Sequence, residues 1–125
     1  LIEIFSCICH LVKKHKKNYQ QLLKESILTY TKDNFTNNNF GLTMISKEFD
    51  FSEAYFSQLF KDYTGENFST YLEKLRMNEA CSLLLTTNMN IKDIAEQIGY
   101  CASNTFSRAF KRSQGISPTY YRRQK

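Results

Sequence analysis

The sequence predicts an all-α protein in which a pair of short helices occurs twice. One Pro and four Gly are present in 125 residues, and apolar residues recur at helical spacing along nearly the whole chain. In addition, residues 42–65 can be aligned with residues 91–115, so the second half of the chain repeats the first. The length suits about one domain with a modest core.

Two helical segments are expected ahead of the first repeat. Residues 1–17 carry an apolar stripe followed by four lysines, and residues 19–33 carry a second stripe in which Leu22, Leu23 and Ile27 face inward. Because the chain lacks an initiator Met, we expect a fragment of a longer protein. Residues 1–18 would then be an amphipathic helix or linker from a missing upstream domain. A dimer contact and a membrane-binding helix at residues 1–17 are the alternatives.

The first repeat follows an Asn-rich loop at residues 34–41. Thr43 resembles the N-cap of its first helix, whose apolar stripe is Leu42, Ile45, Ser46 and Phe49. Asp50 stands in the turn, where Asp tolerates unusual backbone conformations. Ser52 can cap the second helix and Gly65 can end it. The residues of that helix expected to face inward are Phe56, Leu59, Phe60 and Tyr63.

The second repeat, residues 90–115, has the same pattern around a turn at Gly99-Tyr100. Its apolar stripe, Ile91, Ile94, Ala95 and Ile98, aligns with the first at an offset of 49 residues. One extra residue in the second turn makes the offset 50 from there on. Five identities follow, since Phe56, Ser57, Phe60, Lys61 and Gly65 match Phe106, Ser107, Phe110, Lys111 and Gly115. A chance helix pair would not recur with its outward Ser and Lys in register, so the sequence indicates an internal duplication.

A connecting helix is expected between the repeats, over residues 67–86, because no Gly or Pro interrupts this stretch. Its candidate buried residues are Phe68, Tyr71, Leu72, Leu75, Ala80, Leu83 and Leu84. A helix of about twenty residues is about 30 Å long, and successive major-groove faces of B-DNA lie about 34 Å apart. One rigid helix could therefore hold two recognition helices one DNA turn apart. Beyond Gly115, Ser117 is the expected N-cap of a last helix that starts with Pro118.

Charge is distributed unevenly along the chain, whose net charge is +5. Residues 101–125 carry six basic and no acidic side chains, whereas residues 42–100 carry five basic and nine acidic ones. A basic end of this density favours a polyanionic partner, either nucleic acid or an anionic membrane surface. A solvated charged tail is the structural alternative.

The remaining residue types argue against several classes of protein. The cysteines, Cys7, Cys9, Cys81 and Cys101, form no disulfide framework, so a cytoplasmic protein is expected. Cys7, Cys9, His10 and His15 match no standard zinc spacing, so we expect no metal and no cofactor. No signal peptide and no membrane span fit the sequence. Without a clustered carboxylate pair, and with both histidines near the N-terminus, an enzyme is not expected.

A family resemblance appears in both halves of the chain. The second half contains Ile94-Ala95, Gly99-Tyr100, Phe106-Ser107-Arg108-Ala109-Phe110-Lys111, Gly115 and Pro118-x-x-Tyr121-Arg122. The first half contains Tyr55-Phe56, Phe60-Lys61, Thr64-Gly65, Tyr71-Leu72 and Arg76-Met77-x-x-Ala80-x-x-Leu83-Leu84. Over about residues 20–125, the chain resembles the DNA-binding domain of the AraC/XylS family of bacterial transcription regulators.

The resemblance implies a seven-helix domain of two helix-turn-helix subdomains joined by a long connecting helix, to which this chain adds an N-terminal extension helix. Unit one would cover about residues 19–66, the connecting helix about 67–86 and unit two about 90–125. The family also implies double-stranded promoter DNA as partner and regulation of transcription initiation, as an activator that contacts RNA polymerase. A separate sensing or dimerisation domain would lie upstream.

Candidate DNA contacts are the polar residues on the outward faces of the two recognition helices. Arg pairs with guanine, the amides of Asn and Gln pair with adenine, and Ala can touch the thymine methyl group. The candidates for base contacts are Ala54, Ser57, Gln58, Ser103, Asn104, Ser107 and Arg108. The candidates for phosphate contacts are Ser52, Lys61, Arg76, Lys111 and Arg112, with backbone N–H groups at the helix starts near Ser52 and Ser103.

Alternatives remain open for several of these residues. Arg108 could instead contact phosphate or form a surface salt bridge, Gln58 could be an ordinary solvated residue, and Arg76 could brace the connecting helix. Because Glu53 and Asp62 accompany Lys61, the second pair is expected to provide more of the DNA affinity. The competing function is a helical protein–protein adaptor whose basic end binds an acidic partner.

Overall fold

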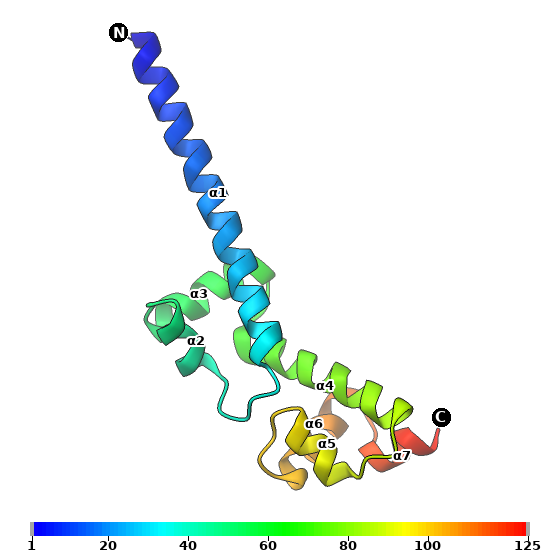
Figure 1. Ribbon diagram of the computed structural model, residues 1–125. Helices are drawn as coiled ribbons and strands as arrows, with labels where there is room; N and C mark the ends of the chain where they lie inside the picture. Colours follow the sequence, from blue (N-terminus) through cyan, green and yellow to red (C-terminus); the bar gives the residue numbers. More distant parts are fainter. Residues whose placement is uncertain (1, 125) are drawn as a thin grey trace. The chain divides into compact units, whose positions relative to one another are not determined.

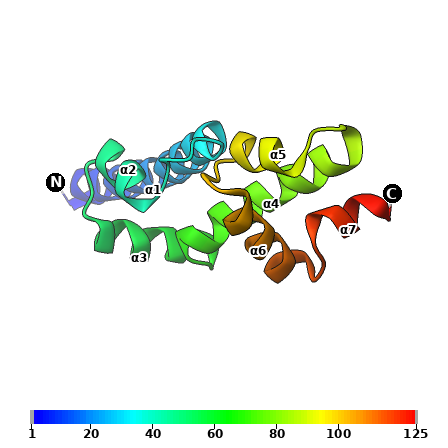
Figure 2. The ribbon, with the colours of Figure 1, turned by 90° about the horizontal axis from the view of Figure 1, so that it is seen from below.

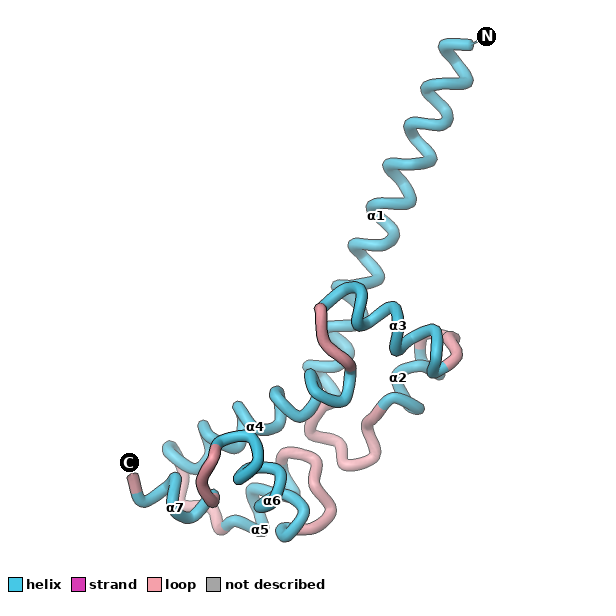
Figure 3. The backbone as a smooth tube through the Cα atoms, turned by 180° about the vertical axis from the view of Figure 1, so that it is seen from behind, coloured by secondary structure: helices cyan, strands magenta, loops and turns pink. Residues whose placement is uncertain are grey.

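The computed structural model describes residues 2–124, with side chains described from residue 18 onward. The described backbone consists of helices joined by loops and turns, and this range holds no strand (Figures 1 and 3). This confirms the all-α prediction. The helices are α1 (Ile2–Asn34), α2 (Leu42–Glu48), α3 (Glu53–Thr64), α4 (Phe68–Thr86), α5 (Ile91–Gln97), α6 (Ser103–Gln114) and α7 (Pro118–Arg123).

Helix α1 corrects the expectation of two separate helices before the first repeat. It is continuous over 33 residues, because neither Gly nor Pro interrupts the backbone there. The chain divides into two compact units, residues 1–30 and 31–125. In the first, Ile27 is buried as predicted, whereas Leu22 is 62% exposed because it lies about 100° around the helix from Leu23. The stripe and the candidate metal ligands at residues 1–17 lie outside the described side chains.

Helices α2 and α3 form the first helix-turn-helix pair. Ser52 caps α3 as predicted, since its Oγ accepts from the backbone N–H of Tyr55 at 3.2 Å. The prediction that Thr43 caps α2 is wrong. The N-cap is Gly41, and the Thr43 hydroxyl instead donates to Glu53 at 2.6 Å, which links the starts of the two helices.

The second pair, α5 and α6, repeats the backbone geometry of the first. The turn bond from Phe51 N to Ser46 O is 2.8 Å long, and its counterpart from Tyr100 N to Ala95 O is also 2.8 Å. Gly65 and Gly115 both have φ of 83° and both donate to the carbonyl four residues earlier at 2.8 Å. Asp50 (φ 58°) and Gly99 (φ 102°) share the left-handed turn position, where Asp is one of the few tolerated side chains. The duplication is therefore confirmed in three dimensions.

Two separate cores hold the pairs. The first is aromatic: the ring of Phe68 meets those of Phe40, Phe56 and Phe60 edge-on at 5.3–5.8 Å. The second gathers the buried residues Met77, Ala80, Leu83, Leu84, Ile94, Ala95, Ile98, Phe106, Ala109 and Phe110. Met77 was not among the predicted core residues. Each large apolar side chain buried in this way contributes about 1.5–3 kcal/mol, so each pair has a substantial core of its own.

Helix α4 runs from the first pair to the second (Figure 2) and packs against helices of both. Phe68 at its start is buried in the first core, whereas its later turns contribute to the second core and pack against α5 and α7. Asn67 caps it by accepting from Thr70 N at 2.8 Å, and its 19 residues span about 28 Å. The predicted connecting helix is thus confirmed. Within the described residues, no helix has the length and apolarity needed to cross a membrane.

Candidate nucleic-acid interface

The outward face of α6 is polar and basic, whereas its inward face is fully apolar. Phe106, Ala109 and Phe110 are buried in the second core. On the opposite side Asn104, Arg108 and Lys111 are exposed, with Ser107 half-buried between them. These four predicted contact residues recur at i, i+3, i+4 and i+7, so they lie along one face of the helix.

The start of α6 differs from the start of α3. Ser103 is the first residue of α6, half-buried, and the N-cap is Ala102, which offers no side-chain acceptor. The first N–H groups of a helix lack partners inside the helix and favour an anion. In α3, by contrast, the exposed Ser52 provides the cap with its own hydroxyl.

The outward face of helix α3 is less suited to binding a polyanion than that of α6. Ala54, Gln58 and Lys61 are exposed and Ser57 is half-buried, in the register that the duplication predicts. The Gln58 amide donates to Asp62 at 2.9 Å, so part of its hydrogen-bonding capacity is used within the helix. The sequence did not single out Tyr55, which is 56% exposed. Its place outside the apolar period of α3 is the signal that could have indicated this exposure.

Formal charge separates the two helices clearly. Helix α6 carries Arg108, Lys111 and Arg112 and no acidic residue, a net of +3, whereas α3 carries Lys61 against Glu53 and Asp62, a net of −1. In the described part of the chain, no ion pair is recorded for Arg108 or Lys111. These two cations are therefore available to phosphate or to base edges.

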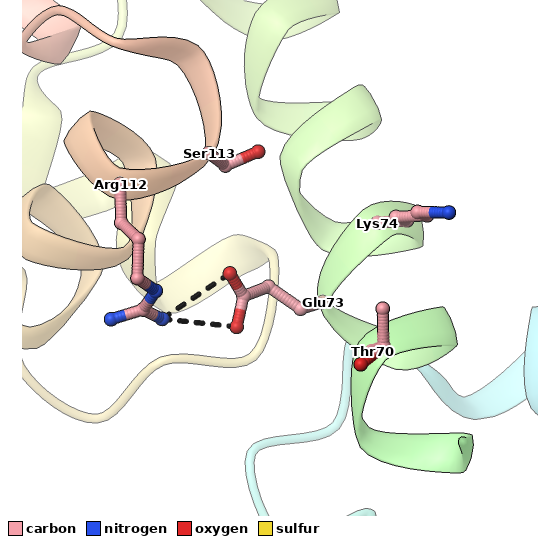
Figure 4. Close-up of a pocket in the computed structure, with 5 residues that line it drawn as sticks. All are labelled: Thr70, Glu73, Lys74, Arg112 and Ser113. Atoms are coloured by element: carbon pink, nitrogen blue, oxygen red, sulfur yellow. Dashed lines mark hydrogen bonds and ion pairs between the residues drawn. The ribbon is translucent and has the colours of Figure 1, made fainter. Parts of the chain in front are cut away.

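Arg112 has a partner of its own (Figure 4). Its Nη2 reaches from α6 to both carboxylate oxygens of Glu73 on α4, at 3.2 and 3.1 Å. The pair borders a recess of about 320 Å³ that is lined by Thr70, Glu73, Lys74, Arg112 and Ser113. The side chain of Arg112 is 66% exposed, so it can exchange this carboxylate for another anion without unfolding α6.

Arg76 lies among backbone carbonyls. Its Nε donates to Phe35 O at 2.9 Å, and its Nη2 donates to Asn37 O at 3.1 Å and Phe40 O at 3.4 Å. Burial lowers the pKa of Arg76, with Tyr100 acting in the opposite direction. These bonds favour the bracing role that the sequence left open for Arg76. We therefore leave it out of the proposed DNA contacts.

Arg122 makes a similar set of bonds inside the second half. It donates to Leu84 O at 3.0 Å, to Met89 O at 2.6 Å and to Thr87 O at 3.2 Å, which links α7 to the last turn of α4 and to the segment that follows it. The sequence showed Arg122 only as part of a motif. Its partners lie 33–38 residues earlier in the chain, so no local pattern could have indicated this role.

Comparisons with known proteins agree with this geometry. Residues 45–124 match the family described as "Helix-turn-helix domain". The HTH-type transcriptional activator RhaR of Mannheimia succiniciproducens is 28% identical over 121 residues, which are 97% of this chain and 44% of RhaR. The chain thus spans less than half the length of that relative.

Solved structures share the fold. The C-terminal domain of the two-component response regulator yesN from Fusobacterium nucleatum superposes with a TM-score of 0.79 and 38% identity, covering 80% of this chain and 97% of that one. The DNA-binding domain of AdpA, solved in complex with a target DNA, has a TM-score of 0.75 at 21% identity and covers 81% of this chain and 90% of its own. The chain therefore belongs to the AraC-type family of helix-turn-helix domains, the DNA-binding domains of transcription regulators.

Proposed function

We propose that this chain binds promoter DNA sequence-specifically, with α3 and α6 in successive major grooves of one face of the duplex. The observation that carries the proposal is the repeated geometry of the two pairs, each fixed to one end of the same helix α4. AdpA, whose domain has this fold, was solved on a target DNA. A rigid spacer of about 28 Å suits recognition helices that enter the groove about one turn apart.

The proposed base contacts are those of the two outward faces. Arg108 and Asn104 on α6 have the side chains that pair with guanine and adenine. Ser103, Ser107, Ser57, Gln58 and Ala54 are the weaker contacts, and Ser52, Lys61, Lys111 and Arg112 neutralise phosphates or donate to them. Because α6 has a net charge of +3 and α3 of −1, we expect α6 to provide most of the affinity.

We further propose that the full protein is a cytoplasmic bacterial activator of transcription initiation. RhaR of Mannheimia succiniciproducens is named as a transcriptional activator, and the match to it supports this assignment. An activator of this kind would contact RNA polymerase and would carry its sensing or dimerisation domain in the part of the protein upstream of this chain.

Selection of binding sites from random duplex DNA, followed by footprinting on the selected site, tests the proposal. Protection over two successive major grooves would support simultaneous binding by α3 and α6. A footprint limited to one groove would remove α3 from the interface. If the chain bound no duplex with the steep salt dependence of phosphate contacts, the proposal would fail and a protein–protein adaptor would be favoured.

A further inference from the structure

Four residues from three segments of the compact unit formed by residues 31–125 meet at one place. They are Phe35 in the loop after α1, Arg76 on α4, and Gly99 and Tyr100 in the turn between α5 and α6; together we name them the Arg76 junction. The Arg76 Nε lies 2.9 Å from Phe35 O, and its Cζ lies 5.6 Å from the ring centroid of Tyr100. A Cβ on Gly99 would stand 2.9 Å from both Arg76 Nε and Phe35 O. The junction therefore has no space for a side chain at residue 99.

On one side, the junction is fastened to the first core. Arg76 Nη2 holds the carbonyls of Asn37 and Phe40 at 3.1 and 3.4 Å. The ring of Phe40 is buried and meets Phe68 edge-on at 5.8 Å. The loop that accepts the Arg76 hydrogen bonds thus belongs to the same core as α3.

On the other side, the junction is fastened to the second core. The Tyr100 ring lies 5.8 Å from Phe106 of α6, and its backbone N–H bonds Ala95 O at 2.8 Å. Gly99, which precedes it, is buried and has a φ of +102°. A movement of Tyr100 would therefore disturb the turn that sets the angle between α5 and α6.

The guanidinium suits this place for a chemical reason. Its planar fork donates within its plane to several carbonyls, while its face can lie on an aromatic ring. A lysine has neither the fork nor the flat face, although it has the same charge. The junction thus depends on the shape of the Arg76 side chain more than on its charge.

We propose that Arg76 is a positioning residue that locks the two helix-turn-helix pairs in one relative orientation and so sets the spacing of the DNA segments that the chain binds together. Without the junction, the two pairs are joined mainly through α4, and a helix can bend and twist along its length. With the junction, each pair is held both by its packing on α4 and by its contact with the Arg76 side chain. This inference rests on the proposed function, since only a protein that uses both pairs on DNA has a spacing to set.

Duplexes that carry the selected site with one base pair inserted or deleted between its two halves test the proposal. One base pair displaces the second half by about 3.4 Å and turns it by about 35°. For the natural chain we expect each change to weaken binding by about tenfold or more. For Arg76→Ala and Arg76→Lys we expect weaker binding at the optimal spacing and a loss of less than about threefold on the altered duplexes.

Arg122→Ala is the matched control. Arg122 also donates to three backbone carbonyls, but all of its acceptors lie in the second half. We therefore expect this variant to be destabilised while its dependence on spacing stays steep. A flattened spacing profile in Arg122→Ala, or an unchanged profile in Arg76→Lys, would overturn the proposal. Thermal melting identifies any variant that does not fold, and Arg76→Lys replaces Arg76→Ala in that case.

A measurement without DNA separates this inference from the proposed function. Residual dipolar couplings of backbone amides report the orientation of each pair in the free chain. We expect one alignment tensor to fit both pairs in the natural chain and in Arg122→Ala, and two tensors to be needed for Arg76→Lys. If the chain bound no duplex, the proposed function would fail, and the couplings alone would still decide whether Arg76 locks the pairs. A single tensor for Arg76→Lys would refute the lock.

Discussion

Replacing Glu73 with Gln should strengthen binding to duplex DNA by freeing Arg112. In the free chain the Arg112 guanidinium is held by the Glu73 carboxylate at 3.1 Å, with side-chain exposures of 66% and 33%. A partly exposed ion pair of this kind is worth about 0.2–1 kcal/mol. A DNA phosphate that binds Arg112 must first break this ion pair. Removing the ion pair should therefore raise DNA affinity by about 1.4- to 5-fold, at about 1.4 kcal/mol per tenfold change.

The assay is fluorescence anisotropy with a labelled duplex of unrelated sequence, titrated at several salt concentrations. The gain should be largest at low salt, because salt screens exposed charges. Glu79→Gln is the matched control, since it removes the same charge from another half-buried position of α4. We expect a smaller gain from it.

A double-mutant cycle shows whether Glu73 acts through Arg112. In an Arg112→Ala background, Glu73→Gln should no longer increase affinity beyond the gain from Glu79→Gln. Equal gains from the two Glu→Gln changes, or an undiminished gain without Arg112, would mean that only the overall charge matters. Either result would refute the competition between Glu73 and phosphate.

Three further predictions concern α6 and its end. Arg108→Ala should cost about 1–3 kcal/mol of specific binding and relax the preference at one base pair; equal losses on every sequence in a competition assay would assign Arg108 to phosphate instead. Lys111→Ala should weaken binding on all sequences and lower the magnitude of the salt slope by about one, and an unchanged slope would contradict a phosphate contact. Gly115→Ala should lower the free energy of unfolding by about 1–2 kcal/mol, because Gly115 has a φ of +83°, a conformation that costs an L side chain energy. An added Cβ would meet nothing within 4 Å, so no steric clash would add to this backbone cost. Urea unfolding measures this loss, and a stability equal to that of the natural chain would show that the left-handed turn is not strained by Ala.

The two pairs differ in surface chemistry although their frameworks match. Their turns and C-caps make the same backbone hydrogen bonds, including the 2.8 Å bonds donated by Gly65 and Gly115. Their outward faces nevertheless differ by four formal charges, from −1 on α3 to +3 on α6. A duplicated framework is preserved by its core and turns, whereas its exposed positions can vary at little cost in stability.

The sequence by itself determined where most helices begin and end and which helical residues form most of the two cores. The apolar period located Phe56, Phe60, Phe106 and Phe110, all of which are fully buried, and caps such as Ser52 and Ser117 act on residues three positions away. These features are local, because the hydrogen bonds of a helix and its caps join near neighbours in the chain. The same apolar period also predicted which residues of α6 face outward.

Only the tertiary structure decided which groups Arg76 and Arg112 contact within the chain. The sequence offered both Arg76 and Arg112 as phosphate contacts, with a bracing role as the alternative for Arg76. In the structure Arg76 bonds carbonyls as far as 41 residues away, and Arg112 bonds a carboxylate 39 residues away. A guanidinium takes whatever acceptor the packed helices bring within about 3 Å, and no spacing along the chain encodes that approach. The acceptors that Arg76 and Arg112 contact were therefore set by how α4 meets its neighbours in the folded chain.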